Sequence, residues 1–254
     1  MQATPSEREA AQEGDFVTYD LNFPALWPYW PQFLDGIRLT LALTAAATTL
    51  GLCLSILVAI GRRSDSPALR TLCGIYVEVL RNTPFIVQIF IFYFGLSSAG
   101  IQMSAAVAAA LAMVINVGAY GAEIVRAGMD AVPPGQIEAA ECLGLSRPRI
   151  YWHVVMQPSL ERVYPALTSQ FVLMMLMSSV ASQISTEELS AVANNIQSDT
   201  YLSLETYIVV AALYVVLALL LKLCFWAIGE AVFRRRRMLR QAARHNRIAV
   251  QGGA

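Results

Sequence analysis

The most regular feature of the sequence is a series of long apolar runs separated by shorter polar stretches. A helix that crosses a bilayer needs about 20 predominantly apolar residues, and several runs reach that length. They are Gly36–Ile60, Thr71–Leu96, Ser104–Arg126, Val163–Ser185 and Thr206–Gly229. The pattern therefore predicts an all-α integral membrane protein with about five transmembrane helices.

Basic residues gather in alternate connections between these runs. The connection 61–70 and the loop 127–162 hold three arginines each, and the tail 231–254 holds seven. The connections 97–103 and 186–205 hold no basic residue. Positive residues beside a span stay on the cytoplasmic side of the membrane. We therefore expect the N-terminus outside and the C-terminus inside, as an odd number of spans requires.

The composition agrees with a membrane protein. Charged residues make up 14% of the chain and apolar residues 56%, whereas soluble domains carry roughly a quarter charged residues. The four cysteines have no CxxC spacing and the two histidines have no ligand-type neighbours. We expect packing cysteines, with neither a disulfide framework nor a metal site.

The two ends of the chain differ from its apolar middle. Residues 1–20 are polar and acidic, and Phe23–Phe33 (FPALWPYWPQF) is aromatic and proline-rich, as in an anchor at the membrane surface. We expect residues 1–35 to be extracytoplasmic and 36–230 to form the membrane domain. The basic tail 231–254 is interpreted as a cytoplasmic topology anchor and not as a nucleic-acid site.

The loop 132–162 reads as two short helices around a turn. Pro134 suits the start of a helix, residues 136–143 can be helical, and Gly144 is placed to end that helix in the left-handed conformation. Ser146 is placed to begin a second short helix. We expect Pro158 to end that helix before the next span.

Part of this loop is apolar although it lies between charged residues. Exposure to the cytoplasm would be unfavourable for the apolar side chains of Ile137, Ala140 and Leu143 unless a partner protein covers them. Short helices of this kind suit insertion into a groove on another protein.

Within the loop, EAAECLG at Glu138–Gly144 resembles the EAA signature of bacterial ABC-importer permeases. Residues 36–230 also resemble the polar amino-acid branch of the type I importers. The matching stretches, in order, are GIRLTLALT at Gly36–Thr44, YVEVLRNTPFIVQIFIFYFGL at Tyr76–Leu96, NVGAYGAEIVRAGM at Asn116–Met129 and YPALTSQF at Tyr164–Phe171. The sequence departs from the family pattern at Met156, because Gln157 stands before Pro158 where the family usually has Leu-Pro.

The resemblance implies a type I ABC-importer permease fold in the bacterial inner membrane. It assigns Glu138, Ala139, Ala140 and Gly144 to a coupling helix that docks on an ATP-binding subunit. The implied partners are two ATP-binding subunits, an identical or homologous second permease subunit, and a periplasmic solute-binding protein. The chain has no GxxxxGK[ST] phosphate loop. We therefore expect no enzyme activity and no cofactor in this chain, with ATP and Mg bound by the partner subunits.

Ionisable side chains inside the predicted spans are the other candidates for function. Such groups are costly in a bilayer and face a cavity, a partner helix or an opposite charge. Glu78 and Arg81, and likewise Glu123 and Arg126, are spaced to share a helix face. We expect each pair to neutralise itself at the cytoplasmic end of its span. The alternative is that a polar set lines a translocation path for an amino-acid zwitterion. Its members are Glu78, Arg81, Gln88, Asn116, Tyr120 and Glu123.

The predicted function is that of an importer permease for polar amino acids. An opine or an amino-acid derivative is an alternative solute. A secondary transporter would show inverted repeats, which the sequence lacks, and a channel would not need the docking loop. The outer loop Thr186–Glu205 holds four acids and no base. It suits either a basic rim on a binding protein or plain solvation.

Overall fold

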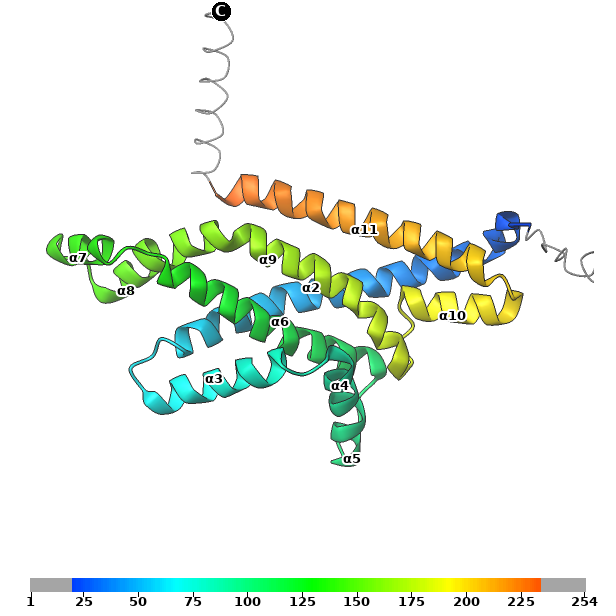
Figure 1. The fold of residues 1–254 in the computed structure, drawn as a ribbon, viewed down its shortest axis with the longest axis horizontal. Coiled ribbons are helices and arrows are strands. Elements are labelled where there is room, and N and C mark those ends of the chain that lie inside the picture. The colour runs from blue at the N-terminus through cyan, green and yellow to red at the C-terminus, as the bar shows by residue number, and fades with distance from the viewer. Residues whose placement is uncertain (1–19, 234–254) are drawn as a thin grey trace, which may run out of the picture.

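The computed structural model describes residues 20–233, and every regular element in that range is helical (Figure 1). Four long helices lie side by side along the molecule: α2 (Trp30–Gly61), α6 (Ala105–Asp130), α9 (Gln157–Met177) and α11 (Ser203–Val232). The shorter elements are η1 (Phe23–Tyr29), α3 (Pro67–Arg81), α4 (Phe85–Phe90), η2 (Ile91–Gly95), α5 (Leu96–Ser98), α7 (Pro134–Cys142), α8 (Arg147–Arg149), η3 (Ile150–Met156), η4 (Ser178–Ile184) and α10 (Leu189–Thr200).

Four helical stretches in the described range are long and apolar enough to cross a membrane. A fifth crossing results if the bent pair of α3 and Phe85–Ser98 counts as one span. The prediction of an all-helical membrane protein with about five spans is therefore confirmed. The beginning of α2 lies with α10 at one end of the bundle, and the last described turn of α11 lies toward the other (Figure 1). We call the second one the α7 end, because α7 and α8 project from it.

The second predicted span, Thr71–Leu96, is not one continuous helix. The axes of α3 and Phe85–Ser98 meet at 110°, and α4 leaves the bundle across its long axis (Figure 1). Pro84 is the physical reason, because proline lacks an N–H and disfavours helical backbone at the residue before it. Pro84 itself has an extended backbone, with ψ at 140°. The predicted span Thr71–Leu96 therefore consists of two helical pieces that meet at the break around Pro84.

The second short helix of the 132–162 loop also differs from its prediction. It does not end before the next span, because α8, η3 and α9 follow one another without a break. The η3 segment is a π-helix in which the Gln157 N–H donates to the Trp152 carbonyl. Pro158 then falls in the first turn of α9, where its missing N–H is tolerated. Proline therefore coincides with a change of helix type and not with a helix end.

The most extensive helix contact among the described residues joins α2 and α6, and small residues lie in it. Ser55 Oγ donates hydrogen bonds to the Gly51 carbonyl on its own helix at 2.7 Å and to the Val117 carbonyl on α6 at 3.0 Å. A Cβ atom added to Gly121 would lie 2.9 Å from the Ser55 Cβ. Backbones approach this closely only where side chains are absent or very short.

All four cysteines lie in the described range and are free, but only one of them is packed even partly inside the chain, which differs from the prediction of packing cysteines. Cys53, Cys142 and Cys224 are exposed, and only Cys73 is partly buried.

Candidate coupling and translocation sites

The loop between α6 and α9 begins with a short helix, α7, that has a proline at its start and a glycine cap at its end. Pro134 opens α7 as predicted, and Pro133 stands before it in extended conformation. Gly144 has a φ of +72°, in the left-handed region. Its N–H donates to the Glu141 carbonyl at 2.9 Å, and the Leu145 N–H donates to the Ala140 carbonyl at 3.2 Å. This pair of bonds is the Schellman motif, which glycine permits without steric cost.

The side chains of this segment divide into a buried and an exposed set. Ala140 is buried, and α7 packs against η3. Glu138, Ala139 and Gly144 are exposed, and Leu143 is 80% exposed at the tip of the loop. The α7–α8 segment projects beyond the ends of the long helices (Figure 1). The loop therefore presents a rigid helix end with an uncovered apolar side chain.

A network of ion pairs lies just before this loop, on the last turns of α6. Arg62 donates to Glu123 at 2.6 Å, and Glu123 also pairs with Arg126. Arg126 pairs with Asp130 at 2.6 Å, and Arg63 approaches Asp130 at 3.3 Å. The predicted Glu123–Arg126 pair is confirmed, and the fold extends it to the connection that follows α2. These ion pairs tie Glu123 on α6 to the end of α2 through Arg62 and to the next turn of its own helix through Arg126.

The predicted neutralisation of Glu78 by Arg81 was wrong. No ion pair joins them in the part of the chain that the structure describes. The Glu78 carboxylate instead accepts from the Asn82 side-chain amide at 3.2 Å. The Arg81 guanidinium lies 5.6 Å from the centre of the Tyr120 ring, whose hydroxyl donates to the Arg81 carbonyl at 3.3 Å. A tertiary contact from α6 thus replaces the local pair.

The two residues also lie away from the α7 end, which is the side that the arginine distribution predicts to be cytoplasmic. They lie in the last turn of α3, which starts at the α7 end with Pro67. At 1.5 Å per residue, that places Arg81 roughly 20 Å along the helix. Both side chains are exposed in the single chain.

Gln88 and Asn116 are brought together by the bend. The Asn116 amide donates to Gln88 Oε1 at 2.8 Å, and both side chains are buried. Gln88 Nε2 donates to the Leu80 carbonyl at 2.7 Å and to the Thr83 carbonyl at 3.1 Å. These carbonyls belong to the end of α3 and the break that follows it. Gln88 therefore provides hydrogen-bond donors for carbonyl groups left unpaired at the helix break, and it joins the bent segment to α6.

Glu188 is a buried acid that the sequence did not single out. It was expected in an acidic outer loop, but Glu188 and Glu205 are both fully buried. Glu188 Oε1 accepts from the backbone N–H groups of Ser190 and Ala191 at the start of α10, and Oε2 accepts from the Tyr214 hydroxyl at 2.7 Å. Glu188 stands directly before the first residue of α10, and an acid at that position is a helix-capping signal in the sequence. The prediction of a solvated acidic loop did not include this signal.

Burial raises the pKa of the Glu188 carboxyl, and the bonds from Tyr214 and the two backbone N–H groups only partly oppose that shift. Because the folded pKa lies above the unfolded one, Glu188 contributes stability that is lost as the pH rises through the folded pKa. The contribution changes by up to about 1.4 kcal/mol per pH unit between the two pKa values.

We expect the melting temperature of the wild-type chain to rise, relative to that of Glu188→Gln, when the pH is lowered from neutrality toward the ordinary pKa of a glutamate carboxyl. Glutamine keeps an acceptor for the α10 N–H groups but cannot titrate. Thermal unfolding of the two chains in the same detergent measures the difference. The exposed neighbour Glu187→Gln is the control and should follow the wild type. Parallel pH profiles for all three chains would contradict the assignment.

Comparison with known proteins identifies the family to which the chain belongs. Residues 51–238 match the family model described as the binding-protein-dependent transport system inner membrane component. The chain belongs to this family. It is 31% identical over 221 residues to an octopine transport system permease protein of Rhizobium radiobacter, covering 84% of this chain and 90% of that protein. It is 31% identical to a probable glutamine ABC transporter permease protein of Bacillus subtilis (strain 168), covering 78% and 92%.

A solved structure agrees with the same assignment. The crystal structure of an amino acid ABC transporter with histidines contains a chain that is 34% identical to this one. The TM-score is 0.77, and the match covers 84% of this chain and 100% of the other. This permease is therefore a multi-pass subunit of the bacterial inner membrane, in the polar amino-acid branch of the family. It is a transport subunit and not a catalytic one.

Proposed function

We propose that this permease, paired with a second permease subunit, forms the path by which a polar amino acid enters the cell. The names of its relatives support that class of solute, with glutamine and octopine among them. A solute-binding protein would deliver the solute from outside, and two ATP-binding subunits would supply the free energy. An opine remains the second candidate solute, because the octopine permease is as similar as the glutamine permease.

The observation that carries the coupling proposal is the exposed end of α7. A leucine that is 80% exposed is costly in water, and the Schellman cap fixes its position. In the proposal, Leu143 and the backbone around Gly144 insert into a groove on the ATP-binding subunit, with Glu138 and Ala139 on the contact face and Ala140 holding α7 on η3. Figure 1 supports a cytoplasmic α7 end, because the basic connections after α2 and α6 lie there.

The translocation path is proposed to run beside the bend at Pro84. Glu78 and Arg81 are charged and exposed in the middle of the chain's second crossing, where lipid would be a poor neighbour. In the assembled transporter we expect them to face the path or the second permease subunit. Gln88, Asn116 and Tyr120 hold that surface in place, and Glu123 links it to the α7 end through its ion pairs.

We expect Leu143→Asp to weaken binding of the cognate ATP-binding subunit about tenfold or more, the factor that ~1.4 kcal/mol represents. A charged side chain cannot enter an apolar groove without losing its hydration. Glu138→Ala is expected to weaken binding less, by about threefold to tenfold, because it removes one charge-assisted bond. Pull-down titration and ATP-dependent uptake in vesicles measure the two effects.

The matched control is Glu187→Ala, an exposed glutamate at the opposite end of the bundle. It should leave ATPase binding unchanged. If Leu143→Asp and Glu138→Ala bind the ATPase and support uptake as well as this control does, the coupling role of α7 is wrong.

A further inference from the structure

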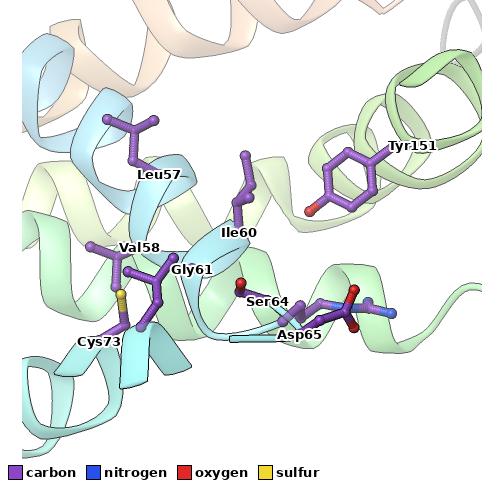
Figure 2. Close-up of a pocket in the computed structure, with 10 residues that line it drawn as sticks. Leu57, Val58, Ile60, Gly61, Ser64, Asp65, Cys73 and Tyr151 are labelled. Atoms are coloured by element: carbon purple, nitrogen blue, oxygen red, sulfur yellow. The ribbon is translucent and has the colours of Figure 1, made fainter. Parts of the chain in front are cut away.

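A pocket of about 490 Å³ opens at the α7 end, between the α2–α3 connection and η3. This volume is typical of a small-molecule site. Apolar walls come from the last turns of α2 and the first turns of α3. Polar groups form its lip, and Tyr151 closes it from η3 (Figure 2). Its lining includes Leu57, Ile60, Arg63, Asp65, Leu69 and Tyr151.

The lip carries both signs of charge. Arg63 meets Asp130 at 3.3 Å, and its guanidinium has five N–H donors, so further donors are free for a ligand. Asp65 takes part in none of the ion pairs found between residues 20 and 233. The Tyr151 hydroxyl points into the pocket (Figure 2), and its one hydrogen-bond partner within residues 20–233 is the Met129 sulfur at 3.4 Å, a weak acceptor. An anion beside Arg63 and Tyr151 and an ammonium beside Asp65 would satisfy all three.

The walls favour an apolar chain on the same molecule. Leu57 is 66% exposed, and Ile60 and Leu69 are also exposed. These three side chains extend from the polar lip of the pocket along the apolar surfaces of α2 and α3. The bilayer would cover those surfaces. A free amino acid offers the two charges but would leave these walls uncovered. A phospholipid with a phosphate and a primary ammonium offers both charges and a chain of the right polarity.

We propose that this pocket binds one phospholipid with an ethanolamine-type headgroup, its phosphate at Arg63 and Tyr151, its ammonium at Asp65 and its chain along Leu57. A phosphatidylcholine head lacks ammonium N–H donors for Asp65, and an anionic phosphatidylglycerol head places no cation there. The site therefore discriminates between headgroups, unlike the general lipid-facing surface of a helix. The lipid would contact residues that precede the α7–α8 segment in the sequence and also Tyr151, which follows it. The proposal does not rest on the coupling role or on the transported solute.

The experiment is native mass spectrometry of the purified full-length chain with phosphatidylethanolamine, phosphatidylcholine or phosphatidylglycerol added in equal amounts. We expect one phosphatidylethanolamine to be retained at least tenfold more than either other lipid. Leu57→Trp fills the pocket and should abolish this retention, and Asp65→Asn should reduce the preference over phosphatidylcholine. Tyr151→Phe, which removes one hydroxyl, should lower retention several-fold.

Leu50→Trp is the matched control, because Leu50 is 58% exposed on α2 and does not line the pocket. It should retain the lipid as the wild type does. Equal retention of the three lipids, or equal loss in the two tryptophan variants, would mean ordinary annular lipid and overturn the proposal. Displacement of the lipid by millimolar glutamine or arginine would overturn it in favour of a free amino acid.

Discussion

Replacing Gln88 by leucine is expected to destabilise the permease by roughly 3 kcal/mol or more, because several buried polar groups lose their partner at once. Each buried group left unsatisfied costs about 1–3 kcal/mol. Gln88 donates hydrogen bonds to the Leu80 and Thr83 carbonyls at the break and accepts one from the Asn116 amide on α6. Leucine has a similar volume, so the loss would come from hydrogen bonding and not from a cavity.

Thermal or denaturant unfolding in detergent measures this loss. The exposed Gln183→Leu is the control and should change stability by no more than about 0.5 kcal/mol. The outcome also decides between two roles for Gln88. A destabilised chain means that Gln88 holds the bend, whereas wild-type stability with lost uptake means that it contacts the solute directly.

Adding a methyl group at Gly121 is expected to disrupt the α2–α6 contact. In Gly121→Ala the new Cβ would lie 2.9 Å from the Ser55 Cβ, and closer still to its hydroxyl oxygen. Overfilling a close-packed contact costs typically about 1–3 kcal/mol. Because this contact lies at the centre of the bundle, we expect a lower melting temperature and a smaller yield of folded protein.

A second substitution makes this prediction specific. Ser55→Gly gives back the space on α2, so Ser55→Gly with Gly121→Ala should be more stable than Gly121→Ala alone. Gly74→Ala on α3 is the control, since a Cβ there meets nothing within 4 Å. Strict additivity of the two changes in unfolding free energy would contradict direct contact between these positions.

The sequence alone determined the features that depend on local chemistry. Runs of apolar residues are long because a bilayer has a fixed thickness, so the spans could be counted without a fold. Pro134 and Gly144 begin and end α7 as expected, because a missing N–H and a missing side chain act on the residue that carries them. The resemblance at Glu138–Gly144 predicted the family for the same reason, since the motif is one continuous segment of the sequence.

The tertiary structure decided which polar groups meet. Spacing on a helix allowed Arg81 to pair with Glu78. In the fold, the Arg81 guanidinium instead lies near the ring of Tyr120 on α6, a contact that no local sequence pattern could predict. Pro84 precedes α4 and interrupts the helix for a local reason, but the hydrogen bond that fastens the bent segment joins Gln88 on α4 to Asn116 on α6. Glu188 looked like a solvated acid until α10 folded onto α2 and α11 and buried it. Burial and partner choice depend on what arrives from distant parts of the chain, and only the folded bundle fixes that.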